Sequence, residues 1–541
     1  MSPALNNCEF FLFRERLKSM NEQIDHNSNV DSNTPLCHLE RNHPKSETVD
    51  HEALMRLEIE TPENVNLDRA PDLVGGFGTF QMLILIIIPL ASTLESIQNL
   101  SIVFVAKDTK WSCATNSTIC NFTGEISSAN DLYCSIPIEE WTFVEPDVSI
   151  VSQFRLVCNV QWMKQLPPSI FHIGSIIGLL VLGWFSDRFG RKKVMIPAYI
   201  LTLTIGLIGC ATPNFTFLLA CYFISGFCVP ALLSSMTVLT SEIVAPKYRA
   251  KSLCIIALAW PLITCLFGVM AYLIREWRLL MLSVQLPFSL ACGALFFVPE
   301  SLQWLLKNDK HKIQDVLARI AHWNKMPIPN CIVVPMTIDH TSRRTSPLYL
   351  FNTWKIARTS LIIGYTWITL NLVNYGVILD SQNLGFKSLY VNFVCLSLVE
   401  IPGILIPYYT LDRLGRKKST LFSSLICVVA FGALALLPEN DSTEIARLIS
   451  AMVTRLFSLV AYCSMVTWTI ESYPTFVRSQ GIGFAFAMAK IGLLSTPWVL
   501  QSSKTLHPAA PKLLFLVLLL IQCGLFVLLP ETNGNNLESQ T

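Results

Sequence analysis

Gly183-Trp-Phe-Ser-Asp-Arg-Phe-Gly-Arg-Lys-Lys193 is a short charged stretch between two long apolar runs. One apolar run opens near Leu166, and the next follows from Val194. Charged side chains are costly inside a bilayer and gather at helix ends. The stretch therefore predicts a tight hinge between two membrane-spanning helices. A partial copy at Leu411-Asp-Arg-Leu-Gly-Arg-Lys-Lys-Ser419 also lies between apolar runs, which indicates two equivalent halves.

The composition is that of an integral membrane protein. Of the 541 residues, 52% are hydrophobic and only 14% are charged, whereas about 25% are charged in an average soluble domain. The net charge of +2 indicates no particular partner. A helical span needs about 20 apolar residues. We predict twelve spans, near residues 80–104, 166–186, 194–212, 216–238, 252–273, 279–298, 355–377, 388–408, 419–437, 445–469, 481–501 and 512–529.

Lysine and arginine are unevenly spread over the short loops, and this bias sets the orientation in the membrane. The loops after the second, fourth and eighth spans are rich in these cations, whereas the loop after the third span has none. The loop after the seventh span has only Lys387. We therefore expect the cation-rich loops and both termini to face the cytoplasm. Residues 105–165 then lie outside.

This orientation divides the chain into five parts. The first residues are polar and lack the basic-then-apolar pattern of a cleaved signal peptide, so we expect a cytoplasmic and largely disordered tail there. The parts are this tail at residues 1–79, a first six-helix bundle at 80–299, a cytoplasmic linker at 300–354, a second six-helix bundle at 355–530, and a cytoplasmic tail at 531–541.

The 105–165 segment has the chemistry of an extracellular loop. An even number of cysteines in an oxidising space predicts two disulfides, in one of three pairings, from Cys113, Cys120, Cys134 and Cys158. Two sequons predict N-glycosylation at Asn116 and Asn121.

Three markers of the first half recur in the second, in the same order and at nearly the same offset. They are Asp187 and Asp412, the Glu242–Arg249 and Glu471–Arg478 stretches, and the Val298–Ser301 and Leu529–Thr532 stretches. The repeat predicts a duplication of six spans plus six. Two parallel repeats about an axis along the membrane normal are the architecture of the major facilitator transporters, with a substrate site near the midplane between the halves.

The whole pattern resembles the organic anion, cation and zwitterion transporters of the animal solute carriers, within the major facilitator superfamily. The matching stretches are Asp72–Gln81, the cysteine-rich loop, Pro299–Leu306 and Glu471–Arg478, and the resemblance covers roughly residues 70–533. The chain departs from these relatives in its long N-terminal tail, in its four loop cysteines where many relatives have six, and in Leu302-Gln303 where Pro-Arg is usual. The resemblance implies an all-α membrane protein of twelve helices in two six-helix bundles.

The resemblance also implies a gating network at the hinges. Gly183 is expected to let the second span pack closely on the eleventh, with Asp187 facing the positive N-terminal end of that helix. Arg191 is expected to pair with Glu242. These pairs would lock the inner side and break when the bundles rock, whereas the simpler alternative is that the cations only fix the topology. The remaining members are Arg249, Glu300, Asp412, Arg416, Glu471, Arg478 and Glu531.

Four ionisable residues within the expected spans are candidates for the substrate site: Glu95, Glu400, Arg455 and Lys490. Lys490 stands where anion-handling relatives carry arginine and cation-handling relatives carry aspartate, so the resemblance implies a carboxylate or sulfate substrate. Glu95 stands where anion-handling relatives tend to be neutral, which leaves a zwitterion or a cation open. Arg455 is basic across the family and does not discriminate, and Glu400 resembles a common acid that serves structure as readily as transport.

Three aromatic residues, Trp367, Tyr375 and Tyr462, match cavity-lining positions of these relatives. They imply a pocket that accepts amphiphilic ions by stacking and cation–π contacts. The alternative is that they face lipid or the helix core.

The sequence contains no pattern that predicts an enzyme, a metal centre, a nucleotide or another cofactor, or nucleic-acid binding. We therefore predict a plasma-membrane secondary or facilitative transporter that carries small organic ions by alternating access, with organic anions as the first choice. A proton or counter-ion is a possible coupling partner. The alternatives are a carrier of zwitterions or cations, and a non-transporting receptor on the same fold.

Overall fold

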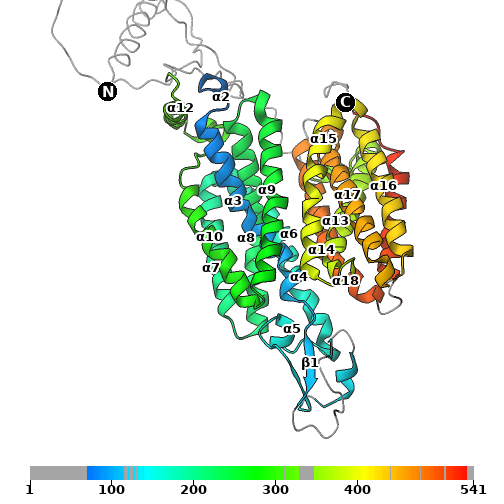
Figure 1. Ribbon diagram of the computed structural model, residues 1–541. Coiled ribbons are helices and arrows are strands. Elements are labelled where there is room, and N and C mark those ends of the chain that lie inside the picture. Colours follow the sequence, from blue (N-terminus) through cyan, green and yellow to red (C-terminus); the bar gives the residue numbers. More distant parts are fainter. Residues whose placement is uncertain are drawn as a thin grey trace, which may run out of the picture.

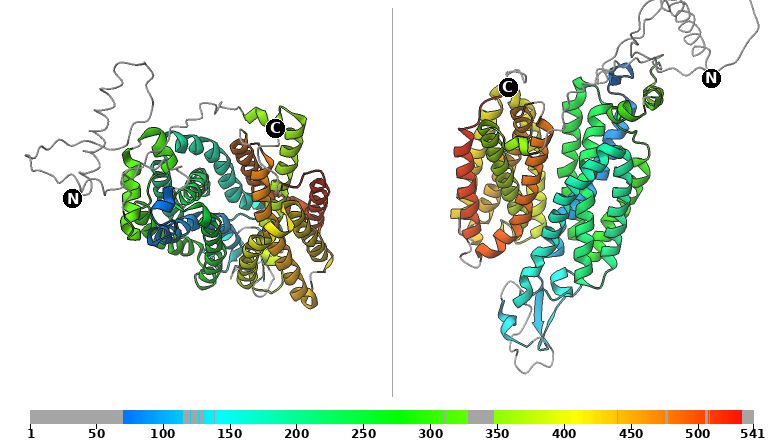
Figure 2. Two further views of the ribbon diagram at one scale, coloured as in Figure 1. Left: turned by 90° about the horizontal axis from the view of Figure 1, so that it is seen from above. Right: turned by 180° about the vertical axis from the view of Figure 1, so that it is seen from behind.

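The computed structural model describes residues 70–114, 120, 126–127, 131–137, 139–309, 311–327, 347–438, 440–474, 477–504, 507 and 509–532. Most of the predicted terminal tails lies outside these residues, as do Asn116 and Asn121. The described chain forms two helical bundles that stand side by side, with a small sheet beyond one end of the first bundle (Figure 1). Figure 2 shows the same division from above and from behind.

The first bundle contains the helices that the first six expected spans predict. Because these segments are apolar nearly throughout, they form long helices that satisfy their backbone hydrogen bonds internally, as a bilayer requires. A short helix, α4 (Ile102–Val105), extends the first of them. The six are α3 (Thr79–Leu100), α6 (Leu166–Phe189), α7 (Arg191–Ala211), α8 (Phe215–Ile243), α9 (Pro246–Leu273) and α10 (Trp277–Leu295).

The second bundle repeats this arrangement, except that two consecutive helices, α14 and α15, together form the eighth expected span. Its helices are α13 (Trp354–Leu379), α14 (Leu389–Leu398), α15 (Glu400–Leu414), α16 (Arg416–Leu436), α17 (Glu444–Ser472), α18 (Arg478–Lys504) and α19 (Ala510–Phe526). Within the described ranges, nine helices are long and apolar enough to cross a membrane. All twelve expected spans coincide with helical segments.

Smaller elements lie at the two ends of the bundles. The helices α2 (Ala70–Leu73), α11 (Leu302–Asn308), α12 (His311–Asn324) and η5 (Pro347–Phe351) belong to one end. We call this end the hinge end, because it also carries Gly190 and Gly415, where α6 meets α7 and α15 meets α16. The opposite end carries α5 (Ile150–Gln153), η3 (Asp131–Ser135), η4 (Cys158–Gln165), η6 (Ser381–Asn383), η7 (Asp441–Thr443) and the sheet, and we call it the sheet end (Figure 1).

The sheet forms a small unit beyond the end of the first bundle, and its buried side chains continue the hydrophobic core of that bundle. It has three antiparallel strands in the order β2 (Ile126–Ser127), β1 (Lys110–Cys113), β3 (Trp141–Phe143). Trp111, Tyr133 and Trp141 pack together and are buried. Of the three pairings open to the four cysteines, the structure contains Cys113–Cys120 and Cys134–Cys158.

Three glycines allow α6 and α8 to approach until their backbones touch. A Cβ atom added at Gly174 or Gly178 would collide with the backbone of Phe223 or Phe227, and one added at Gly226 would collide with the backbone of Phe171. Small residues four apart on a helix serve this kind of close packing in membranes, where van der Waals contact replaces the hydrophobic effect between helices. The first bundle is therefore tightly packed around this pair.

Candidate substrate site and gating residues

The hinge between α6 and α7 is built around a glycine and a carboxylate. Gly190 has φ +106°, a conformation that other residues rarely adopt. A Cβ atom there would also lie only 2.6 Å from Glu300 Oε2. The other oxygen of this carboxylate, Oε1, accepts hydrogen bonds of 3.0 Å from the backbone N–H groups of Lys192 and Ser301. Glu300 thus stabilises the start of α7, where backbone N–H groups have no partner within the helix.

The hinge between α15 and α16 repeats this construction. Gly415 has φ +85°, and a Cβ atom there would lie 2.7 Å from Glu531 Oε2. Glu531 accepts hydrogen bonds from the backbone N–H groups of Arg416, at 3.0 Å, and Lys417, at 3.1 Å. Arg416 therefore stands at the start of its helix as Arg191 does in the first bundle.

Each of these arginines lies beside an acid of its own bundle. Arg191 Nε is 4.0 Å from Glu242 Oε1, and the second oxygen of Glu242 accepts a 2.7 Å hydrogen bond from the Ser301 hydroxyl. In the second bundle the ion pair is tighter: Arg416 Nη2 is 3.0 Å from Glu471 Oε1.

The remaining hinge residues lie at the same end but do not all meet as expected. Arg249 and Arg478 each donate a 3.4 Å hydrogen bond to a backbone carbonyl of their own bundle. Asp187 is exposed, and no atom of the described residues lies within 4 Å of a Cβ placed on Gly183. The close packing of the second on the eleventh span that was expected at Gly183 is therefore absent from this conformation. The side chain of Asp412 lies outside the described set.

The two bundles meet at the sheet end. Phe104 of α4 packs against Tyr390 and Phe393 of α14, with ring centroids 5.6 Å and 4.7 Å apart. On the neighbouring pair of helices, Trp498 Nε1 of α18 donates a 2.7 Å hydrogen bond to Ser169 Oγ of α6. The Trp162 ring of η4 lies 6.4 Å from the Trp498 ring. These contacts close the space between the bundles on the sheet side.

A cluster of polar side chains lies deeper along this seam, the contact surface between the two bundles. His172 of α6 is completely buried, and among the described residues neither of its ring nitrogens has a hydrogen-bond partner. Its ring meets the edge of Tyr375 of α13 at 5.8 Å, and Lys490 of α18 acts on it electrostatically. Tyr375 also donates a 3.2 Å hydrogen bond to the backbone carbonyl of Asn99 in α3. Residues of both bundles thus surround one point.

Arg455 takes no part in this cluster, because it belongs to a buried ion pair inside the second bundle. Its side chain pairs with Glu400, with a 2.8 Å hydrogen bond from Nε to Oε1, and it also donates a 2.8 Å bond to Asn374 Oδ1. Arg455 and Glu400 are only 7% and 3% exposed. A charge buried this deeply requires a partner, and Glu400 supplies it. Glu400 is therefore the ion-pair partner of Arg455. The side chain of the remaining ionisable candidate, Glu95, lies outside the described set.

The other two aromatic candidates belong to a cluster within the second bundle. Trp367 is buried and donates a 3.1 Å hydrogen bond to Thr469 Oγ1. Its ring packs edge-to-face against Tyr462, at 5.0 Å, and Phe486, at 5.5 Å. Phe486 is the exposed member of the cluster. Trp367 therefore packs in the core, which was the alternative for an aromatic residue in a span.

His172 is the seam residue that sequence reasoning missed. It lies on the second expected span and was not among the four ionisable candidates that the sequence analysis named. The signal was present, since an ionisable side chain inside an apolar span is a functional candidate by default.

Comparison with known proteins agrees with this architecture. Residues 163–497 match the Major Facilitator Superfamily. The xylose transporter XylE from E. coli, in a partially occluded inward-open conformation, aligns with a TM-score of 0.60 at 15% identity, over 85% of this chain and 100% of that chain. XylE bound to 6-bromo-6-deoxy-D-glucose aligns with a TM-score of 0.59 at 16% identity, over 85% and 98%. The fold is thus that of a multi-pass membrane transporter.

Sequence relatives narrow the family. Solute carrier family 22 member 1 of Oryctolagus cuniculus is 30% identical over 400 residues, which is 73% of this chain and 71% of the relative. Solute carrier family 22 member 2 of Mus musculus is 29% identical over 402 residues, or 73% and 72%. The chain belongs to solute carrier family 22 within the major facilitator superfamily, and it is a transporter rather than an enzyme.

Proposed function

We propose that this chain carries small organic anions across the plasma membrane by alternating access. The observation that carries the proposal is that the charge of Lys490 lies close enough to the buried ring of His172, at the seam, to act on it. Lys490 offers an ammonium group. The ring nitrogens of His172, which have no hydrogen-bond partner in the described part of the chain, offer a donor and an acceptor. In a space of low dielectric constant, such groups favour a carboxylate or sulfate.

The pairing of the Arg455 charge also supports this assignment. Since its charge is matched by Glu400 within the second bundle, Arg455 adds little net charge to the seam. Charge selection then depends on Lys490. The ring of Tyr375, which packs against His172 at 5.8 Å, would hold the apolar body of an amphiphilic anion.

The chain's charge pattern supports an orientation with the hinge end in the cytoplasm. Arg191–Lys193 and Arg416–Lys418 lie at that end, as the bias of basic residues towards the cytoplasm requires. Both disulfides lie at the sheet end, as an oxidising extracellular space favours. The conformation described here, closed at the sheet end, is then inward-facing.

The hinge pairs support a gating role. In this conformation, Arg191–Glu242 and Arg416–Glu471 stay within their own bundles, and Asp187 is exposed. When the bundles rock and the hinge end closes, Gly183 and Asp187 would approach α18. The hinge residues would thereby stabilise the outward-facing state.

Glu95 favours one alternative, a carrier of zwitterions or cations. It is an acid within α3, the helix whose Asn99 contacts Tyr375. An acid at that place would receive the cationic end of a substrate. Uptake of anionic, zwitterionic and cationic probes of similar size, at two pH values and at a clamped membrane potential, separates the two functions.

Substitution of Lys490 tests the first choice. Lys490→Ala should abolish uptake of a sulfated steroid into expressing cells, because the charge that attracts the sulfate is lost. Surface expression should stay normal. Lys387→Ala is the matched control, since Lys387 is an exposed lysine of the same bundle. Unchanged uptake by Lys490→Ala would remove Lys490 from the site.

A further inference from the structure

A second cavity, of about 200 Å³, lies at the sheet end of the second bundle. Helices α13, α16, α18 and α19 enclose it, together with the segment that contains η6. All of its lining residues come from the second bundle, and Lys490, Tyr375 and Arg455 are not among them. It is therefore separate from the seam.

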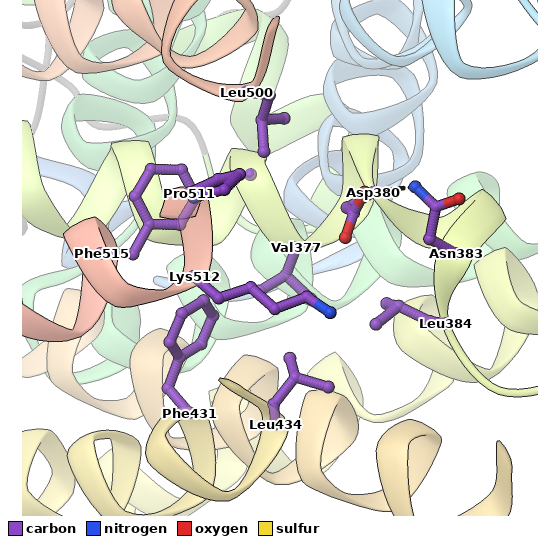
Figure 3. Close-up of a pocket in the computed structure, with 11 residues that line it drawn as sticks. Val377, Asp380, Asn383, Leu384, Phe431, Leu434, Leu500, Pro511, Lys512 and Phe515 are labelled. Atoms are coloured by element: carbon purple, nitrogen blue, oxygen red, sulfur yellow. Dashed lines mark hydrogen bonds between the residues drawn. The ribbon is translucent and has the colours of Figure 1, made fainter. Parts of the chain in front are cut away.

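The cavity contains one side chain of each charge. Lys512 of α19 is only 8% exposed, and Figure 3 shows its side chain extending across the cavity towards the side that holds Asp380 and Asn383. Asn383 donates a 2.6 Å hydrogen bond to Asp380 Oδ1, which fixes the direction of the carboxylate. Both charged side chains therefore line the same small cavity.

The rest of the wall is apolar. Phe431 and Leu434 of α16, Phe515 of α19 and Val377 of α13 are buried, whereas Asn383 is exposed at the rim (Figure 3). A concave, mainly apolar space with a few convergent polar groups is the usual form of a small-molecule site. The volume is below the roughly 300–1,000 Å³ of pockets for drug-sized ligands, so its occupant is small.

We propose that this cavity is a binding site for a small zwitterion of amino-acid size. The anionic group would lie beside Lys512, the ammonium group beside Asp380, and a short apolar body against the packed rings of Phe431 and Phe515. One basic and one acidic group give the cavity no net charge, which matches a zwitterion better than a simple anion or cation. The proposal goes beyond the transport function and does not depend on the charge of the transported substrate.

Three probes of similar shape test the charge requirement. The full-length chain, purified in detergent, is titrated by calorimetry with L-leucine, with 4-methylpentanoate, which lacks the ammonium group, and with isoamylamine, which lacks the carboxylate. Leucine should bind at least about tenfold more tightly than either analogue, because each charged hydrogen bond lost costs roughly this factor. No leucine binding, or equal binding of the three probes, would overturn the proposal.

Substitutions of lining residues test whether leucine binds in this cavity. Asp380→Asn and Lys512→Met should each weaken leucine binding about tenfold or more. Asp441→Asn and Lys387→Met are matched controls, since these two residues form an exposed ion pair at the same end of the same bundle, 3.3 Å apart, and they should leave binding unchanged. Leu500→Phe changes no charge and fills the cavity, so it should also abolish binding, and it provides a second test if Lys512→Met fails to fold.

The seam variant distinguishes this proposal from the transport function. Lys490→Ala should leave leucine binding unchanged while it abolishes uptake of the sulfated steroid. If Lys490→Ala abolishes leucine binding whereas Asp380→Asn does not, leucine occupies the seam and the second site is refuted. If uptake survives in Lys490→Ala but leucine binding depends on Asp380, only the transport proposal fails.

Discussion

The two hinges are close copies of one another, whereas the two surfaces that meet at the seam differ in chemistry. At each hinge, a glycine with positive φ lies against a glutamate from the end of its bundle, Glu300 or Glu531, and an arginine follows the glycine. At the seam, the first bundle contributes the buried ring of His172. The second bundle contributes Lys490, whereas its Arg455 is paired with Glu400 inside that bundle.

This contrast matches the proposed roles of the two regions, with the hinges serving movement of the bundles and the seam serving selection of the substrate. Under the proposed alternating access, both bundles rock, so both need the same turn and the same helix start. The substrate of such a carrier binds once, between the bundles, so the groups that bind it need not be repeated. Equivalent substitutions at the two hinges, and separate substitutions on the two sides of the seam, test this comparison.

The largest effect is expected from the buried ion pair of the second bundle. Arg455→Met leaves the Glu400 carboxylate buried without its partner, which typically costs about 3–5 kcal/mol of stability. The thermal unfolding midpoint of the purified protein should fall sharply.

A double variant controls for lost packing. Arg455→Met combined with Glu400→Gln removes both charges and should unfold at a higher temperature than the single variant, because no unpaired charge remains. A single variant as stable as the parent protein would mean that Glu400 does not depend on Arg455.

The hinges should respond equally to the loss of glycine. Gly190→Ala and Gly415→Ala each place a Cβ atom at positive φ and within 2.7 Å of a glutamate oxygen. Each should lower the free energy of unfolding by roughly 1–3 kcal/mol. Denaturant or thermal unfolding measures the loss.

Each bundle offers a glycine as its own control. Nothing lies within 4 Å of a Cβ added to Gly293 in the first bundle or to Gly524 in the second. Alanine at these positions should be tolerated. A large loss at one hinge and none at the other would break the equivalence of the two hinges.

The smallest effect is expected at His172. His172→Gln keeps a hydrogen-bonding side chain of similar size but alters its reach, so the KM for an anionic probe should rise about three- to tenfold, as for one neutral hydrogen bond. Concentration-dependent uptake measures it. The exposed His322 gives the control His322→Gln. An unchanged KM would make His172 a packing residue.

The architecture could be predicted from sequence because its signals are strong and repeated. Twenty-residue apolar runs, basic loops and the recurring hinge with its Pro-Glu partner each predict the same two-bundle fold. The disulfide pairing could not be predicted, since four cysteines allow three pairings and spacing alone does not choose.

The candidate site could be predicted less completely from the sequence, because contacts across the seam join residues far apart in the chain. Arg455 and Glu400 were both identified as ionisable residues inside spans, but only the fold shows that they neutralise each other. His172 is also an ionisable residue inside an expected span. Its place in the candidate site becomes visible only in the fold, which brings α6, α13 and α18 together.

The Cys134–Cys158 bond links the small sheet unit to the seam. Cys158 is the first residue of η4, whose Trp162 and Gln165 contact Trp498 and Gln501 of α18. The sheet unit is thus covalently tethered to the segment whose side chains close the bundles. Under the proposed alternating access, a molecule that binds this unit more tightly in one transport state than in the other, such as an antibody fragment, would shift the balance between the two states from outside the substrate path.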